Sequence, residues 1–370
     1  MSENTTTSLQ EKNILFFTGT MNRGGTERVI VQLCKILKDK VGKIVVCSKG
    51  GVGVKLLEEI GIKHITIPDI RAKNPVNICR CTRILKRIVK EENINVIHTH
   101  HRMSAFYATI LKWYKKYTVI NTCHNVFNDK KAFNRFAYKH LHLIAVGEQV
   151  KKNVVEFYGL PSSQVTVIHN AVEPFIGEIQ PVPTLQAWRK DGCVIAGYSG
   201  RLSPVKGLEY FVQAMPIVKQ SVPNAKFAIV GDGEEKARLT ELVKALEMEN
   251  DVVFLGYRTD VQNVIGQMDV IVLPSLTEGL PLTPIEAFSV GRPVVATAVD
   301  GTPEVVQDGK NGYLISTKNA GEIADKLIQL MLDKRQRICF GESAKQRYEE
   351  EFSFAMYAKR ITEYYQTVCK

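Results

Sequence analysis

Short apolar segments alternate with helical patterns along the chain, and this alternation limits the fold more than any other feature. In the first half, the apolar segments are 13–19, 43–49, 63–68, 95–100, 117–124 and 141–147. Patterns with apolar residues at helical spacing lie between them, as in 24–40 and 79–93. Strands that alternate with helices predict an α/β domain, a parallel sheet with helices on both faces.

The pattern weakens over 170–192, where three prolines lie, and then begins again. Residues 193–201 read as a strand that enters a glycine turn, and a helical pattern follows at 204–220. The sequence therefore predicts two doubly wound domains that face each other across a cleft. We place the first domain at 1–175, a linker at 176–192, the second domain at 193–350 and a C-terminal helix at 351–370. Ligands of such sheets bind beyond the carboxyl ends of the strands.

The positive charge lies in the first half. Residues 1–175 hold 27 Lys and Arg against 13 Asp and Glu, whereas 176–370 hold 22 against 25. This excess indicates a polyanionic partner, such as anionic lipid, nucleic acid or a phosphorylated substrate, or else general solubility. Lys and Arg alternate with aromatic residues in 111–118 and 129–140, as is typical of a membrane interface. Nucleic-acid binding is the other interpretation, but no nucleic-acid motif accompanies these segments.

Several function classes lose support. The polar start does not read as a signal peptide, and no apolar run reaches the ~18 residues of a membrane span. Eight cysteines without a CxxC pair suit a reduced, intracellular chain. The chain has neither the phosphate-binding loop of NTPases nor a GxGxxG after a strand. The histidines of 98–101 lack a third ligand, so we expect no metal site.

Loops that follow strands carry residue types that bind phosphates or sugars. Gly24 and Gly25 precede a helix, where glycine either lets a phosphate approach the backbone or forms a plain tight turn. Arg201 and Lys206 lie at the same place in the second domain, and two cations before a helix suit a diphosphate. His124 ends a strand, a position that suits either contact with a sugar or phosphate, or a buried, hydrogen-bonded histidine.

Two glutamates, Glu278 and Glu286, lie in the apolar segment 275–297. The stretch 283–286, Thr-Pro-Ile-Glu, fits a capping box with proline at the first helical position. A helix that starts near Thr283 would therefore account for Glu286 locally. It would not account for Glu278, which follows a strand on a loop.

The spacing Glu278-x7-Glu286 resembles the E-x7-E motif of retaining glycosyltransferases of family 4, which have the GT-B fold. The segments GGTERV, YSGRLSPVKG, IVGDGEE, VVFLGY and GTPEVVQDGKNGYL also resemble that family, in its order. The resemblance spans nearly the whole chain and is more specific in the second half. It implies two Rossmann-like domains, with the acceptor in the first and the nucleotide sugar in the second. It also implies that the final helix crosses back to the first domain.

The resemblance implies roles for the matching residues. Arg201 and Lys206 hold the donor diphosphate, Glu278 contacts the transferred sugar, and Glu286 accepts hydrogen bonds from the ribose. The implied catalytic residues are Glu278, His124, Arg201 and Lys206. The implied donor-binding residues are Gly24, Gly25, Arg201, Lys206, Gly231, Gly256, Tyr257, Glu278, Gly279, Leu280, Pro281 and Glu286.

The activity implied is that of a hexosyltransferase that moves a sugar, expected from a UDP-sugar, with retention and without a metal or other cofactor. The expected acceptor is lipid-linked or a glycan, above all a polyprenyl-diphosphate-linked sugar in surface polysaccharide biosynthesis. We expect a cytoplasmic protein, peripheral on the inner face of the cytoplasmic membrane, with its basic first domain on anionic lipid and no nucleic-acid partner. Two alternatives stay open: a UDP-sugar epimerase or phosphorylase-type enzyme on the same fold, and a non-catalytic membrane-associated scaffold.

Overall fold

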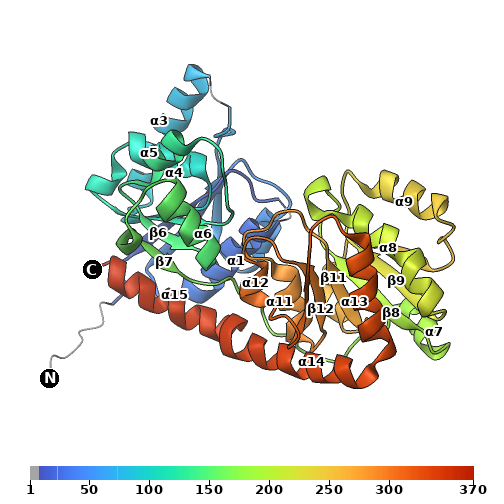
Figure 1. Ribbon diagram of the computed structural model, residues 1–370. Helices are drawn as coiled ribbons and strands as arrows, with labels where there is room; N and C mark the ends of the chain where they lie inside the picture. Colours follow the sequence, from blue (N-terminus) through green and yellow to red (C-terminus); the bar gives the residue numbers. More distant parts are fainter. Residues whose placement is uncertain (1–7, 23, 73) are drawn as a thin grey trace. The chain divides into compact units, whose positions relative to one another are not determined.

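The structure, a computed structural model, describes residues 8–22, 24–72 and 74–370. It divides into two compact units, coloured along the chain in Figure 1. Unit 1 takes in the chain up to Asn170 together with Tyr357–Lys370, and unit 2 is Ala171–Met356. The chain therefore passes from one unit to the other twice, and its last helix belongs mostly to unit 1.

Unit 1 is built on a seven-stranded parallel sheet. Its strands, in spatial order, are β3 Lys63–Thr66, β2 Lys43–Ser48, β1 Asn13–Phe17, β4 Val96–Thr99, β5 Thr118–Cys123, β6 His142–Ala145 and β7 Val165–Val167. The central strands are buried on both faces, which explains why they read as continuous apolar runs. In β1, Phe16 lies opposite Val46 on one side and His98 on the other.

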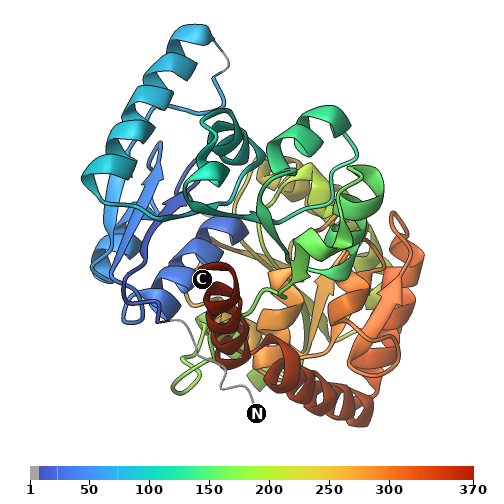
Figure 2. The ribbon, with the colours of Figure 1, turned by 90° about the vertical axis from the view of Figure 1, so that its left-hand side faces the viewer.

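The helices of unit 1 follow the strands in turn. They are α1 Gly25–Leu37, α2 Val54–Glu59, α3 Pro75–Glu91, α4 Arg102–Ile110, α5 Lys131–Tyr138, α6 Glu148–Lys152 and the greater part of α15 Phe354–Val368, with short helical turns η1 Trp113–Lys115, η2 Asn153–Phe157 and η3 Ser162–Gln164. Asn74 caps α3, because its side chain accepts a hydrogen bond from the Asn77 backbone at 2.7 Å and Pro75 follows it. Figure 2 shows α3 as a long helix at the outer edge of unit 1.

Unit 2 repeats the plan with six parallel strands. In spatial order they are β10 Val252–Gly256, β9 Ala225–Val230, β8 Val194–Ser199, β11 Val270–Leu273, β12 Val294–Thr297 and β13 Gly312–Ile315. The helices are α7 Pro183–Lys190, α8 Leu208–Ser221, α9 Lys236–Ala245, α10 Val261–Ile265, α11 Leu282–Ser289, α12 Thr302–Val305, α13 Ala320–Leu332 and α14 Lys334–Arg347, with the turns η4 Pro204–Lys206 and η5 Tyr348–Phe352. Helix α13 packs beside α8, and α11 packs against α10 and α14.

The parallel α/β fold predicted from the alternation is confirmed in both units. Two local features differ from expectation. The segment 176–192, read as a linker, contains α7, because Pro183 occupies the first turn and Leu185 is buried. The tail is not one continuous helix: a π-helical turn ends at Phe352, and α15 begins at Phe354. Over the described ranges, no helix is both long and apolar enough to cross a membrane. All eight cysteines are free thiols.

Candidate functional site

The chain order of each sheet reverses at one place, and the predicted site residues lie near those places. In unit 1 the reversal lies between β1 and β4, and in unit 2 between β8 and β11. Helices cover opposite faces on the two sides of such a point, so the loops at the carboxyl ends of the strands diverge there and leave room for a ligand. Each unit therefore offers one candidate half-site.

In unit 2, glycines bring the loops after β8 and β9 into close contact. Gly231 has a φ of 132°, and a Cβ built on it would lie 1.8 Å from the backbone oxygen of Gly200. Gly233 meets the oxygen of Leu202 in the same way, at 2.2 Å. Tyr198 donates from its hydroxyl to the backbone oxygen of Arg201 at 3.0 Å. These contacts fix the backbone that carries Arg201, whose side chain is exposed.

Lys206 and Glu278 form an ion pair between the loops after β8 and β11. Lys206 donates from Nζ to Oε1 of Glu278 at 2.5 Å, and Ser275 donates to the same oxygen at 2.6 Å. The side chains are 24% and 9% exposed, so the pair is shielded from solvent on most sides. Gly207 allows this approach: its φ is 59°, and an added Cβ would lie 2.3 Å from the oxygen of Pro274. Two predicted residues far apart in sequence thus meet.

The loop of Glu278 is also fixed by its backbone. Asp300 accepts a hydrogen bond from the Glu278 backbone nitrogen and another from the Thr277 hydroxyl, both at 2.7 Å. Gly301 donates to the oxygen of Gly279 at 3.0 Å, with no room for a side chain. The predicted donor residues Leu280 and Pro281 follow, both buried. The backbone that carries the carboxylate of Glu278 is therefore held in place by Asp300 and Gly301.

The capping box predicted at 283–286 is absent, and that prediction is wrong. Helix α11 begins at Leu282, and its first residues lack a side-chain cap. Thr283 donates its hydroxyl to the backbone oxygen of Ser199 at 2.9 Å instead, which ties α11 to the end of β8. Glu286 lies in the fifth position of α11 and is 4% exposed, so helix capping does not explain it. Its role in binding ribose stays a prediction.

The remaining predicted residues of unit 2 lie at the end of β10. Gly231 donates to the backbone oxygen of Gly256 at 2.8 Å. Gly256 has a φ of 65°, which turns the chain out of the strand, and Tyr257 follows with 47% of its surface exposed. These residues thus adjoin the glycine loops through the sheet.

Unit 1 has a pocket of about 190 Å³ at the carboxyl ends of β1, β4 and β5. Its lining includes residues from all three strand ends, from the start of α1 and from the loop after β3; among them are Thr20, Glu27, Arg71, His100, His101, Arg102, His124 and Phe127. The predicted residue His124 therefore lines a pocket. Gly24 and Gly25 begin α1 and are exposed, whereas the lining residues of this helix are Thr26 and Glu27.

Three histidines form a contiguous stack at the pocket: His100 and His124 line it, and the fully buried His98 stacks on His100. The rings of His98 and His100 lie 4.3 Å apart, and His100 Nδ1 lies 3.1 Å from His124 Nε2. His98 contacts Tyr365 of α15 at 2.6 Å and Thr122 at 2.7 Å. Burial lowers the pKa of His98 to about 3 and that of His124 to about 4, with a neighbouring histidine as the smaller cause in each case. All three are neutral at pH 7, so His124 offers hydrogen bonds and no charge.

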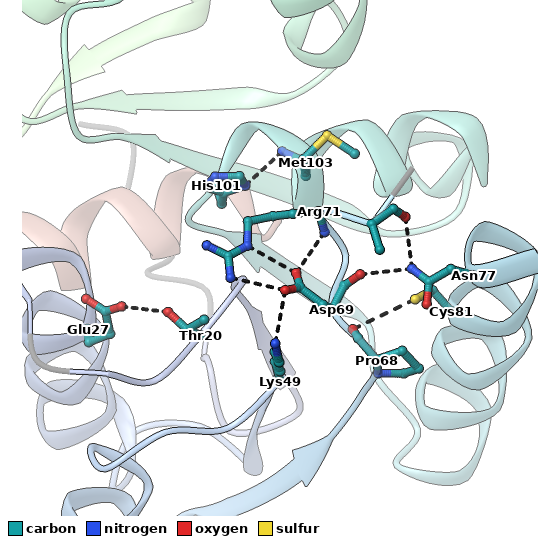
Figure 3. Close-up of polar contacts among 11 residues, drawn as sticks. Thr20, Glu27, Lys49, Pro68, Asp69, Arg71, Asn77, Cys81, His101 and Met103 are labelled. Atoms are coloured by element: carbon teal, nitrogen blue, oxygen red, sulfur yellow. Dashed lines mark hydrogen bonds and ion pairs between the residues drawn. The ribbon is translucent and has the colours of Figure 1, made fainter. Parts of the chain in front are cut away.

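Arg71 and Glu27 place opposite charges on the pocket wall (Figure 3). Asp69 accepts hydrogen bonds from Nε and Nη2 of Arg71, both at 3.1 Å, and Lys49 donates to it at 3.2 Å. The guanidinium holds the pKa of Asp69 well below its usual range. Glu27 accepts from the hydroxyl of Thr20 at 3.1 Å. Asp69 thus occupies one edge of the Arg71 guanidinium, and the other edge can donate to an anionic ligand.

Arg102 and Phe127 form a further part of the wall. Arg102 donates to Asp129 at 2.8 Å, and its guanidinium lies 4.9 Å from the centre of the Phe127 ring. The backbone of Phe127 is held by Asn153 and by the Tyr158 hydroxyl. His101 caps α4 by accepting from the Met103 backbone at 3.1 Å. Phe127 is 38% exposed, and its ring, carried on a backbone held by these bonds, can stack on a sugar.

The sequence missed most of this pocket. Glu27 lies within the segment GGTERV, but no role was predicted for it. His100 and His101 lie within 98–101 and were considered only as metal ligands, which the sequence did not support. Arg71 lies on a loop without a motif, so no signal pointed to it. Among the described residues, no group of three or more His, Cys, Asp or Glu is arranged to hold a metal.

Two family comparisons cover the chain in succession. Residues 23–174 match the family described as "Glycosyltransferase Family 4", and residues 186–347 match "Glycosyl transferases group 1". The chain belongs to glycosyltransferase family 4. It is accordingly a hexosyltransferase.

Relatives and a solved structure agree with this assignment. An Escherichia coli UDP-Gal:alpha-D-GlcNAc-diphosphoundecaprenol alpha-1,3-galactosyltransferase is 25% identical over 84% of this chain and 85% of its own. The N-acetyl-alpha-D-glucosaminyl L-malate synthase of Bacillus anthracis is 25% identical over 77% and 76%. The crystal structure of Anabaena HepE in complex with UDP superposes with a TM-score of 0.82, covering 96% and 100%, at 21% identity. The glycosyltransferase therefore has the GT-B fold.

Proposed function

We propose that this glycosyltransferase transfers a sugar from a UDP-sugar, with retention of configuration, to an acceptor that carries a phosphate or carboxylate, foremost a polyprenyl-diphosphate-linked sugar in surface polysaccharide synthesis. The observation that carries the proposal is the Lys206–Glu278 pair at the switch point of unit 2. It places a cation and a carboxylate side by side, as a diphosphate joined to a sugar requires.

The donor chemistry follows from the charges in unit 2. The UDP leaves with the electrons of the anomeric C–O bond, and Arg201 and Lys206 stabilise its developing charge. Glu278, held by Lys206, Ser275 and the backbone bond to Asp300, orients the sugar hydroxyls. The acceptor hydroxyl attacks on the same face, and its proton passes to the departing phosphate. Because the cations supply the positive charge, we also propose that transfer needs no metal, so EDTA should leave the rate unchanged.

The acceptor chemistry rests on the pocket of unit 1. The names of two relatives point to L-malate and to a sugar on diphosphoundecaprenol as their acceptors, and both are anionic. Arg71 is oriented at the pocket wall by its bonds from Nε and Nη2 to Asp69, and the rest of its guanidinium can donate to an anionic acceptor. His124 is neutral and can accept or donate a hydrogen bond at the reacting hydroxyl. We assign the acceptor to this pocket.

The test is a transfer assay with UDP-glucose, UDP-galactose and their N-acetylamino counterparts, and a short-chain polyprenyl-diphosphate-sugar as acceptor. Lys206→Ala should lower kcat/KM about 100-fold or more, because a charge-stabilising donor is lost. Lys219→Ala is the matched control: Lys219 is 27% exposed and pairs with Asp251 at 2.7 Å in the same unit. An unchanged rate for Lys206→Ala would refute the site. Interconversion of UDP-sugars without an acceptor would favour an epimerase. UDP binding without turnover of any donor would favour a non-catalytic scaffold.

We further propose that unit 1 binds the inner face of the cytoplasmic membrane. Unit 1 holds 30 Lys and Arg against 13 Asp and Glu. On α5, Phe136 is 41% exposed, and Lys131, Arg135 and Lys139 around it are exposed too. Lys139 Nζ lies 5.5 Å from the centre of the Phe136 ring. An aromatic ring among cations suits the level of lipid headgroups.

Vesicle co-sedimentation tests the membrane proposal. Wild-type protein should bind vesicles with 30% phosphatidylglycerol, a chosen composition, more tightly than neutral ones, and Phe136→Ser should weaken this binding several-fold. Ile217→Ser in unit 2 is the matched control, because Ile217 is also 41% exposed. Equal binding to both kinds of vesicle would remove the electrostatic argument.

A further inference from the structure

Unit 2 has a groove that is larger than the pocket of unit 1. It lies at the end of the unit 2 sheet opposite to the Lys206–Glu278 pair. Its volume is about 760 Å³, within the range of small-molecule sites. It is lined by Asp269 before β11, by 289–292 before β12, by α14, by Arg189 of α7, and by Phe175, Gly177 and Ile179. These positions are at the amino ends of the strands, whereas Arg201, Lys206 and Glu278 lie at the carboxyl ends. The groove is therefore not part of the candidate donor site.

The charge of the groove is opposite to that of its unit. Unit 2 as a whole holds 19 Lys and Arg against 25 Asp and Glu. The groove is lined by five cations, Arg189, Arg292, Lys334, Arg337 and Lys345, and by two acids, Asp269 and Glu342. A general basic surface does not explain this local excess.

Helix ends explain part of it. Helices of a parallel α/β unit end where the strands begin, so carbonyl groups collect there. Arg292 donates to the oxygen of Gly266 after α10 at 2.6 Å, and Lys345 donates to Ser289 at the end of α11 at 2.7 Å. Arg337 donates to Leu330 and Met331 at the end of α13. Each of these three cations thus donates to backbone carbonyls at helix ends through one nitrogen of its side chain.

The guanidinium groups still exceed their counter-ions. Asp269 lies 3.6 Å from Arg189 and 4.0 Å from Arg337, and its other oxygen accepts from the Ile195 backbone at 2.9 Å. One carboxylate thus serves several arginines. The Nε of Arg292 is buried and has no hydrogen-bond partner within the described part of the chain. A buried, unsatisfied donor destabilises the fold, and a bound ion is one of the explanations that such a group calls for.

We propose that this groove binds a phosphate group, with Arg292 at its base and Arg189, Arg337 and Lys334 around it. Three guanidinium groups line the groove, and a tetrahedral oxyanion has enough acceptor oxygens to bond to more than one of them. Phe175, Ile179, Val290 and Ile338 form an apolar wall, which suits the uncharged part of a phosphate ester. Burial and the charge of Arg189 lower the pKa of Arg292, so an anion bound beside it would stabilise its charged form. The site is independent of the proposed transfer reaction.

Phosphate binding is measured by calorimetry in an Arg201→Ala, Lys206→Ala background, which removes the candidate diphosphate cations of the donor site. Inorganic phosphate should bind this background protein, and Arg292→Gln should weaken binding at least about tenfold, since a charge-assisted hydrogen bond is worth ~1.5–3 kcal/mol. Lys334→Ala, at the rim, should weaken it a few-fold. Lys244→Ala, an exposed lysine of α9 outside the groove, should bind as the background does.

Two further arms keep the test decisive. Glycerol 3-phosphate stands for a soluble ester and vesicles with phosphatidic acid for a lipid headgroup, so tighter binding of one identifies the source of the phosphate. If Arg292→Gln does not fold, Lys334→Ala against Lys244→Ala carries the comparison. The proposal is overturned if phosphate binds no better than chloride at equal ionic strength, or if both lysine variants bind phosphate alike.

Discussion

Units 1 and 2 share a strand order and differ in what stands at the carboxyl ends of their strands. In unit 2, glycine backbones touch one another, as Gly231 does Gly200, and they hold one ion pair, Lys206–Glu278. In unit 1, side chains from separate loops form the pocket, and its lining residues His100 and His124 stack with His98. The first site depends on backbone contacts and the second on side chains, so substitutions should affect them in different ways.

The titratable residues differ as well. All eight histidines of the chain lie within the first 170 residues, and therefore in unit 1. The two tryptophans are divided, Trp113 in unit 1 and Trp188 in unit 2. The Trp113→Phe variant keeps Trp188, which then reports on unit 2 by its fluorescence. The Trp188→Phe variant keeps Trp113, which then reports on unit 1. The comparison between units can therefore be made within one molecule.

The largest effect should come from Gly231→Ala. Its Cβ would collide with the Gly200 backbone at 1.8 Å, and its φ of 132° strains any side chain. We expect a loss of about 3 kcal/mol in the unfolding free energy of unit 2 and loss of UDP binding. Urea unfolding followed by Trp188, and calorimetry with UDP, measure these changes.

Gly309→Ala separates strain from collision. Gly309 has a φ of 70° with nothing near its Cβ position, so it should cost about 1 kcal/mol and leave UDP binding intact. If both variants lose UDP binding alike, close backbone contact is not what forms the site of unit 2.

The sequence indicates the site of unit 2 better than that of unit 1, because the first depends on glycine loops and the second on side chains from separate loops. Glycine-containing loops and the spacing of Glu278 and Glu286 are local patterns, so they led to residues that the fold brings together, such as Lys206 and Glu278. Arg71 meets Glu27 and His101 at one pocket only through the topology of the sheet. No local pattern marks such residues.

A local pattern can also mislead. The segment 283–286 has every residue of a capping box, yet the Thr283 hydroxyl bonds to Ser199 in a neighbouring strand. Thr283 bonds to Ser199 because the start of α11 packs against the end of β8. The local sequence of α11 holds no information about this neighbouring strand. Likewise, the prolines of 176–192 suggested a linker, although Pro183 begins α7. The parallel fold itself follows from apolar runs and helical spacing, and these were sufficient.

His124→Ala should be the second largest effect, and it tests unit 1. We expect kcat for transfer to fall about 100-fold, because the proposed acceptor pocket loses a hydrogen-bonding group. UDP affinity should not change, because the glycine loops and Lys206 belong to unit 2. His140→Ala, an exposed histidine of unit 1, is the control. A parallel fall in UDP affinity would show that His124 does not act separately from the donor loops.

Acid should destabilise unit 1 before unit 2. Burial lowers the folded pKa of His101 and His124 to about 4 and that of His98 to about 3, against an ordinary value of 6.5. Because the unfolded state binds the proton first, stability is lost as the pH falls from about 6.5 to about 4, by ~2 kcal/mol for each such histidine at pH 5. The Trp113 signal should therefore unfold at lower urea at pH 5 than at pH 7.5, with a smaller change for Trp188.

His101→Asn tests the origin of that pH dependence. Asparagine can keep the cap on α4 but does not titrate, so the variant should lose less stability between pH 7.5 and pH 5. His140→Asn at the surface should follow the wild-type profile. Identical profiles for all three proteins would exclude His101 as a source of the acid sensitivity.

A smaller effect on transfer should come from Tyr365→Phe on α15. The Tyr365 hydroxyl lies 2.6 Å from His98 Nδ1, and both residues are fully buried. Removal of the hydroxyl leaves a buried imidazole nitrogen unsatisfied, which should cost about 1–3 kcal/mol. The loss should appear in the Trp113 transition of unit 1 and not in that of Trp188.

Tyr364→Phe on the same helix is the matched control, since its ring is buried as well. Because His98 stacks on His100, which contacts His124, Tyr365→Phe should also lower transfer slightly at unchanged UDP affinity. An equal loss of stability in both tyrosine variants would mean that the packing of α15, rather than its bond to the histidine stack, stabilises unit 1.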